Sequence, residues 1–285
     1  MKHRAGKAGA GDPINAERHA LKIAVEVAGA WHQGGGPDRV DIPLGVVATL
    51  AAASIAATRR DVLLEWLRGR TPAQFVGWAR WAWKEVLLQC PDVIRMAAPV
   101  LGWLTADGKR FGDRIKRTAD AALAAGLLDL AGGDRRFDAD LFGPMLGALR
   151  APAAASVNAQ MYTPGDVAVA LTAVMLDDVQ PGKAFCDDTV GTGGLFRAAA
   201  QVVRDRGFNP ATMTWYGADV DELAVAAAAV NGLIWQLGPN VILYVGDPLT
   251  DPDWQAKAAQ QHAQFQREVK VLQGLSSMMD LQRRT

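Results

Sequence analysis

The pattern of apolar and polar positions changes near residue 150. Before that point apolar residues recur at helical spacing, which predicts helices throughout residues 15–150. One of them, at 43–57, is apolar on every side but too short to cross a bilayer, so it is predicted to be buried. After residue 150, short apolar runs that end in acids alternate with alanine-rich helical patterns. This alternation predicts parallel strands joined by helices.

The fold class predicted from this pattern is α/β, with an all-helical N-terminal domain followed by a partial Rossmann-like domain. A proline- and alanine-rich stretch at 143–157 marks the expected boundary. The expected organisation is a disordered basic tail at 1–14, a helical domain at 15–150 and the partial sheet domain at 151–285.

An aromatic stripe lies on the helix that Thr71 and Pro72 are predicted to start. It comprises Phe75, Trp78, Trp81 and Trp83. Such a stripe is typical of a packed core, and a base-stacking surface is the alternative.

A basic segment follows, with five cations against Asp113: Lys109, Arg110, Arg114, Lys116 and Arg117. A helix is then expected at 115–128, a glycine turn after it, and a short strand at 137–142. Together these elements are compatible with the end of a winged helix, in which case the cations contact DNA phosphates. The alternative is a solvated helical face beside a loop.

Composition limits the possible functions. The chain of 285 residues holds 30 basic and 30 acidic side chains, so attraction to nucleic acid requires a local basic patch. Cys90 and Cys186 are far apart in apolar contexts, which favours buried thiols of a reduced, cytoplasmic protein. The four histidines are scattered, so no metal site is expected, and no membrane segment is predicted.

The strongest local signal is a glycine-rich turn between the first predicted strand and a helix. Asp187 ends the strand, and Gly191, Thr192, Gly193 and Gly194 form the turn. Glycines allow a sharp turn and close approach of a ligand, and the helix start adds free N–H groups. A plain structural turn is the alternative.

The next two predicted strands also run into acids. Asp219 follows the second strand, about 26 residues after Gly193, close to the spacing at which an acid meets a nucleotide ribose. Asp247 follows the third strand at 241–245. Ligands of such sheets bind at the carboxyl ends of the strands, where these acids are expected to meet.

These segments resemble the adenine-N6 DNA methyltransferases, especially the modification subunits of type I restriction systems. The resemblance covers about 100 residues and four segments in order: Gln160 to Pro164, Asp187 to Gly194, Gly217 to Asn231, and Gly246 to Leu249. It implies a partial methyltransferase domain that binds S-adenosylmethionine (SAM). Asp188 and Thr189 depart from it, because the family has proline and alanine there.

The resemblance implies a role for each site residue. Asp219 is expected to accept both ribose hydroxyls, Asp247 the adenine amino group, and Asp187 the methionine ammonium. The four turn residues would pack the ligand against backbone. The family segment that closes over the ligand corresponds to Tyr162, Thr163 and Pro164.

The family's catalytic segment, an acceptor followed by two prolines and an aromatic residue, is not found, since the chain has no Pro-Pro pair. The nearest candidates are Asp251 and Trp254, which follow Asp247 without room for an intervening strand.

Two hypotheses about the function stay open. The first is a SAM-binding protein that is degenerate or depends on a partner to complete the sheet and transfer a methyl group to DNA. The second is a non-enzymatic DNA-binding or assembly protein. A nicotinamide-dependent enzyme is a third possibility, but it would leave the Thr163-Pro164 segment and the Gly246-Asp247 pair without a role.

Overall fold

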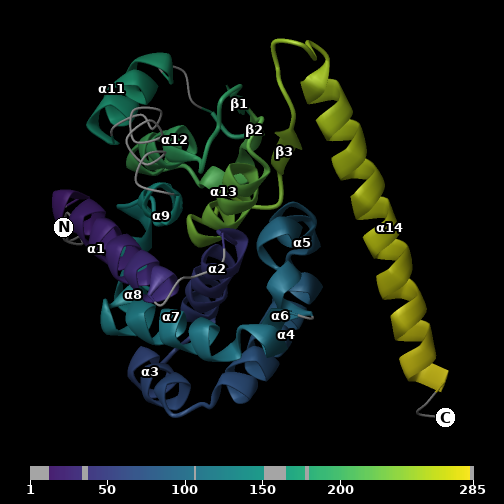
Figure 1. Ribbon diagram of the computed structural model, residues 1–285. Coiled ribbons are helices and arrows are strands. Elements are labelled where there is room, and N and C mark those ends of the chain that lie inside the picture. Colours follow the sequence, from purple (N-terminus) through teal and green to yellow (C-terminus); the bar gives the residue numbers. More distant parts are fainter. Residues whose placement is uncertain (1–12, 34–37, 106, 151–164, 177–179, 283–285) are drawn as a thin grey trace, which may run out of the picture.

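A helical body carries a small parallel sheet at one end, as the computed structural model shows (Figure 1). The structure describes the backbone of residues 13–33, 38–105, 107–150, 165–176 and 180–282. The expected tail therefore lies largely outside the described residues, although its last two residues already belong to the first helix.

The N-terminal helices are α1 (Pro13–His32), α2 (Asp41–Ala56), α3 (Arg60–Arg68), α4 (Pro72–Gln89), α5 (Pro91–Ala97), α6 (Asp107–Arg110), α7 (Gly112–Ala124), α8 (Leu127–Ala131) and α9 (Phe142–Leu149). Short 3-10 turns, at Ala98–Val100, Gly102–Leu104 and Asp134–Phe137, connect some of them.

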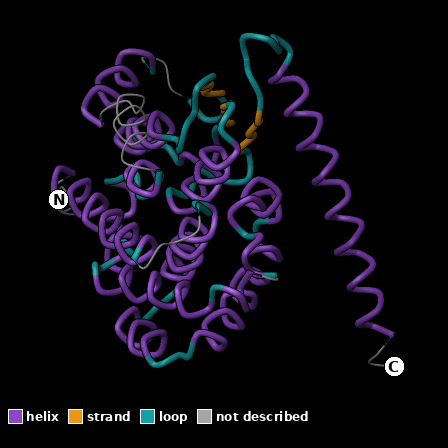
Figure 2. Tube along the Cα trace, in the orientation of Figure 1, coloured by secondary structure: helices purple, strands orange, loops and turns teal. Residues whose placement is uncertain are grey.

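The C-terminal elements alternate, as the sequence predicts. They are α11 (Gly165–Met175), β1 (Ala184–Asp187), α12 (Gly194–Asp205), a 3-10 turn at Pro210–Thr212, β2 (Thr214–Asp219), α13 (Glu222–Ile234), β3 (Val241–Val245) and α14 (Trp254–Gln282). Figure 2 shows how small the sheet is beside the helices. The predicted α/β class and the three predicted strands are confirmed.

Helix α2 is the centre of the helical body. It is buried along most of its length, as its apolar sequence predicts. Its two hydroxyl side chains are satisfied locally, because Thr49 donates to the Gly45 carbonyl and Ser54 to the Ala51 carbonyl. The indole N–H of Trp83 donates to the Thr49 hydroxyl at 2.8 Å, which ties α4 to α2.

Helix α4 begins as predicted. Thr71 and Gln74 form a reciprocal capping box, and Pro72 occupies the first turn. Of its aromatic stripe, Phe75 and Trp83 are core residues, whereas Trp81 is 58% exposed. The interpretation of the aromatic stripe as part of a packed core thus holds only for the residues on the buried face of the helix.

The sheet is parallel with the order β1-β2-β3. Helices α12 and α13 pack on one face, where Phe196 of α12 contacts Phe185 and Trp215. Trp254 and Ala258, at the start of α14, cover Tyr216 and Tyr244 on the other face. In Figure 1, α14 then continues along one side of the molecule, and among the described residues it packs mainly against β3 and α5.

The helical body and the sheet share one hydrophobic core. Helix α13 packs against α2 and α5 as well as against β2 and β3. Helix α9 lies within the stretch interpreted as a domain boundary, and its apolar face is buried. The boundary near residue 150 stays a prediction.

Two local predictions are wrong. Residues 137–142 form no strand, because they end a 3-10 turn and start α9, so the winged-helix interpretation fails. The expected helix at 115–128 is divided at Gly126, whose φ of +90° is left-handed.

Both cysteines are free and partly buried. Burial raises the pKa of the Cys186 thiol to about 11, and the neighbouring Asp188 adds to this shift. Within the described helices, none is long and apolar enough to cross a membrane.

Candidate cofactor site

The glycine-rich turn and the three acids meet at the carboxyl ends of the strands. Asp187 is the last residue of β1 and Asp219 the last of β2. The backbone N–H of Gly246 donates to the Asp219 carbonyl at 2.9 Å, which brings the turn carrying Asp247 beside the end of β2. Parallel pairing therefore gathers residues that are up to 60 positions apart along the chain.

The glycine-rich turn requires glycine at two positions. Gly191 has φ +52° and Gly193 has φ +94°, both in the left-handed region. A side chain at Gly193 would also approach the Trp235 ring to 3.0 Å. The turn ends where α12 begins, so the first amides of α12 lack helical partners.

Asp219 holds the turn in place. Its Oδ2 accepts a hydrogen bond from the Gly191 N–H and its Oδ1 accepts one from the Asp221 N–H, each at 2.9 Å. A carboxylate oxygen has two lone pairs, so both oxygens retain capacity for a further donor. Asp219 thus has a structural role that does not exclude ligand binding.

Asp187 is buried, and burial raises the pKa of its carboxyl group. A hydrogen bond from the Thr189 N–H opposes this shift, whereas the charges of Asp188 and Asp219 add to it. Among the described side chains, no cation pairs with Asp187. The site therefore has an excess of negative charge that a cationic group of a ligand would relieve.

Asp247 lies in the turn after β3. Its Oδ1 accepts from the Leu249 N–H at 2.9 Å, and its carbonyl accepts from Thr250 and Asp251. Two apolar side chains follow the strand-end acids and are exposed, Val220 at 69% and Leu249 at 93%. The sequence analysis named Leu249 as the end of a matching segment but gave it no role, and it missed Val220, although an apolar residue just after a strand-end acid is a recognisable signal.

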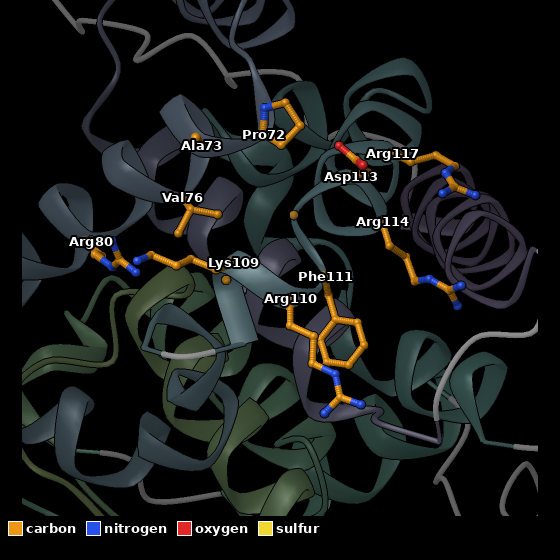
Figure 3. Close-up of a pocket in the computed structure, with 12 residues that line it drawn as sticks. Pro72, Ala73, Val76, Arg80, Lys109, Arg110, Phe111, Asp113, Arg114 and Arg117 are labelled. Atoms are coloured by element: carbon orange, nitrogen blue, oxygen red, sulfur yellow. The ribbon is translucent and has the colours of Figure 1, made fainter.

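A second feature, distant from the sheet, is a basic cleft between α4 and the α6–α7 segment. Its volume is about 550 Å³. Figure 3 shows its cationic side chains, which are Arg80, Lys109, Arg110, Arg114 and Arg117. Pro72, Val76 and Phe111 supply apolar lining, and Asp113 is the acid among the lining residues.

The cations of the basic segment differ in availability. Lys109, Arg110 and Arg117 are exposed. Arg114 donates to the Trp31 carbonyl at 3.1 Å and lies over the Trp31 ring, so it is partly engaged in packing. Lys116 is wrongly included as a phosphate contact, because it is buried and both oxygens of Asp120 bind its ammonium at 2.6 Å.

Comparison with known proteins identifies the part of the chain that contains the strand-end acids. Residues 138–266 match the sequence profile of the family described as N-6 DNA Methylase. This part of the chain is similar to the N-6 DNA methylase family. The resemblance stated from the four sequence segments is thereby confirmed.

Among solved structures, the chain matches the type I restriction-modification system methyltransferase subunit from Streptococcus thermophilus. The match has 16% sequence identity and a TM-score of 0.42, and covers 84% of the present chain and 60% of that chain. The present chain therefore spans about 60% of the length of that subunit. A search of curated proteins gives no match.

Two further groups of predicted site residues were the segment at 162–164 and the candidate catalytic pair. Tyr162, Thr163 and Pro164 lie outside the described residues, so their role stays a prediction. The candidate catalytic pair is engaged within the protein. Trp254 is 3% exposed, stacks on Tyr244 and donates its indole N–H to Asp188, while Asp251 bonds Tyr244 and Lys257. In this arrangement neither side chain is free to meet a base, and their catalytic role is untested.

The described residues contain no cluster of histidine, cysteine and acidic side chains that would hold a metal ion. Two polar residues near the strand ends escaped the sequence analysis: Asp140, which contacts the glycine-rich turn, and Arg150, which contacts the loop after β2.

Proposed function

We propose that the chain binds SAM at the carboxyl ends of β1, β2 and β3 as a protein of the adenine-N6 DNA methyltransferase type. The observation that carries the proposal is that Asp187, between a glycine-rich turn and Asp219, is buried and pairs with no described cation. A zwitterionic ligand fits this arrangement. Its ammonium would relieve the charge of Asp187, and its carboxylate would meet the first amides of α12.

The remaining ligand groups have matching partners. Asp219 has spare lone pairs for two ribose hydroxyls, and Asp247 is an acceptor for an adenine amino group. Val220 and Leu249 are exposed apolar side chains beside these acids, suited to covering the faces of adenine. Tyr162, Thr163 and Pro164 are proposed to close over the bound cofactor.

Calorimetric titration with SAM tests the proposal. We expect micromolar binding by the wild type, loss of binding in Asp219→Ala and no change in Glu268→Ala, which removes an exposed acid from α14. A folded wild-type chain that does not bind SAM at millimolar concentration would contradict the proposal.

For the reaction itself, we propose that the chain depends on a partner for methyl transfer to DNA. The sequence has no Pro-Pro segment, and the nearest acceptor and aromatic, Asp251 and Trp254, are engaged in packing. Within the described sheet both β1 and β3 are edge strands, and a partner's strands would add at such an edge. Robust methylation of adenine in DNA by the purified chain alone would overturn this dependence.

The basic cleft supports a second candidate function, binding of DNA without catalysis. Lys109, Arg110 and Arg117 are exposed cations around a concave surface, which suits contact with the phosphate backbone. The two functions are separable, since DNA binding that is strongly salt-dependent but indifferent to SAM, in a chain that does not bind SAM, would favour the second.

A further inference from the structure

Asp140 lies just before α9 and makes an unusually complete set of hydrogen bonds. Its Oδ1 accepts from the Phe142 and Gly143 amides at 3.0 and 3.1 Å, which caps α9. The same carboxylate accepts from the Thr192 hydroxyl at 2.5 Å and from the Asn231 side-chain amide at 2.8 Å. One carboxylate therefore links α9, the glycine-rich turn and α13.

Asn231 completes the link to the turn. Its Nδ2 also donates to the Thr192 carbonyl at 2.8 Å, so both Nδ2 hydrogens have acceptors. The opposite orientation of the amide would place its oxygen against two acceptors, which fixes the orientation. Thr192 and Asn231 are both fully buried, so these hydrogen bonds are not exchanged for water.

The opposite end of α9 makes a second polar contact with the site. Arg150, at the C-terminal end of the helix, pairs with Asp221 through Nη2 and Oδ2. Asp221 caps α13, and its own N–H donates to Asp219. The two ends of α9 thus contact the two loops that bear the proposed cofactor residues.

We propose that Asp140 is a positioning residue of the cofactor site, and that α9 holds the glycine-rich turn and the loop after β2 in register. The contribution of Asp140 to SAM affinity rests on the function proposed above, whereas its effect on the conformation of the turn does not. Without the Asp140 carboxylate, the buried Thr192 hydroxyl and Asn231 amide lose their shared acceptor. The turn then samples conformations in which the α12 amides and Asp219 are out of position.

Asp140→Ala and Asp140→Asn test the proposal together. The amide group of the asparagine variant retains one oxygen acceptor and gains donors that the Thr192 hydroxyl is able to accept, so it partly restores the link. Asp134→Ala is the matched control, since it removes an exposed acid from the same segment. Thr192→Val removes only the hydroxyl and replaces Asp140→Ala if that variant does not fold.

The first readout is hydrogen exchange of the amides at 190–196 without any ligand. We expect exchange about tenfold faster in Asp140→Ala, near-wild-type exchange in Asp140→Asn and Asp134→Ala, and no change in α4 in any variant. Unchanged exchange at 190–196 in a folded Asp140→Ala or Thr192→Val variant would overturn the proposal, as would equal effects of Asp140→Ala and Asp134→Ala.

SAM titration is the second readout and separates the two proposals. We expect affinity to fall about tenfold in Asp140→Ala and to recover in Asp140→Asn. Faster exchange at 190–196 in Asp140→Ala with no SAM binding by the wild type would support the positioning role and contradict the proposed cofactor. SAM binding that is equal in the wild type and Asp140→Ala, despite faster exchange, would overturn the role of Asp140 in the cofactor site.

Discussion

The carboxylate of Asp219 accepts a hydrogen bond from the backbone N–H of Gly191 at 2.9 Å. The acid at the end of β2 thereby fixes the turn that follows β1. A residue expected to serve only a ligand also maintains the conformation of its neighbour. Ligand affinity and local stability are therefore linked at this residue.

Asp219→Ala is expected to lower the free energy of unfolding by about 1–3 kcal/mol, because it leaves the Gly191 and Asp221 amides without their acceptor. Asp219→Asn retains one oxygen acceptor, so we expect roughly half that loss. Urea unfolding followed by circular dichroism measures both. Equal stability of the wild type and Asp219→Ala would mean that the amides find water instead.

Asp187 predicts a pH dependence. Its pKa is raised in the folded protein, mainly by burial, so the folded state binds the proton more tightly than the unfolded state. Stability therefore decreases as the pH rises from the ordinary aspartate value, about 4, through the raised value. Without ligand, Asp187→Asn is expected to be more stable than the wild type at neutral pH, and this gain should vanish in acid.

The matching measurement is the urea midpoint of both proteins at neutral pH and near the ordinary pKa of aspartate, about pH 4. The same variant should bind SAM more weakly, since the ligand ammonium loses its counter-charge. If the stability difference between Asp187→Asn and the wild type does not change with pH, burial does not destabilise the ionised Asp187 carboxylate.

Gly217 in β2 predicts a packing effect. A Cβ at this position would lie 2.9 Å from side-chain atoms of Leu243, Phe196 and Val190. Gly217→Ala is expected to cost about 1–3 kcal/mol of stability through overpacking. Gly77→Ala is the matched control, because Gly77 is exposed in α4 with open space around it, and it should gain about 0.5–1 kcal/mol. Similar effects of the two changes would contradict this reasoning.

Trp254 anchors α14 to the sheet. Its ring is buried against Tyr216 and Tyr244, so Trp254→Ala is expected to cost about 3 kcal/mol and to expose the first turns of α14 to hydrogen exchange. Trp81→Ala removes the same side chain from an exposed position and should change stability by less than about 0.5 kcal/mol. The anchoring role fails if α14 keeps its protection in Trp254→Ala.

The features predictable from the sequence were those encoded locally. The run from Phe185 to Gly194 contains a strand, its terminal acid and its turn glycines within a few residues. The apolar pattern and the glycines were therefore enough to predict the strand and the turn. The capping box at Thr71 is equally local. The carboxyl ends of parallel strands lie at the same edge of a sheet, so the proximity of Asp187 and Asp219 was predicted correctly.

The features that escaped prediction depend on contacts between distant segments. Asp140 meets Thr192 across 52 positions, and Arg150 meets Asp221 across 71, with no local signal for either. Lys116 was misjudged for another reason, because α7 turns that residue inward while Arg117 faces out. Asp120 at the i+4 position was a readable sign of the Lys116 ion pair.

The basic cleft yields the last prediction. If it contacts DNA phosphates, Lys109→Glu combined with Arg117→Glu should weaken DNA binding and lower the slope of log K against log salt by about 2. The loss should be similar for unrelated DNA sequences, because phosphate contacts carry no sequence information. Fluorescence anisotropy with short duplexes at several salt concentrations measures both effects.

The control must remove the same charge without touching the cleft. Arg267→Glu combined with Lys270→Glu does so on the exposed side of α14. If both double variants lose the same affinity and slope, net charge alone governs binding and the cleft has no special role. A loss confined to the Lys109 and Arg117 variant places the DNA backbone at α6 and α7, because Lys109 and Arg117 line the cleft whereas Arg267 and Lys270 do not.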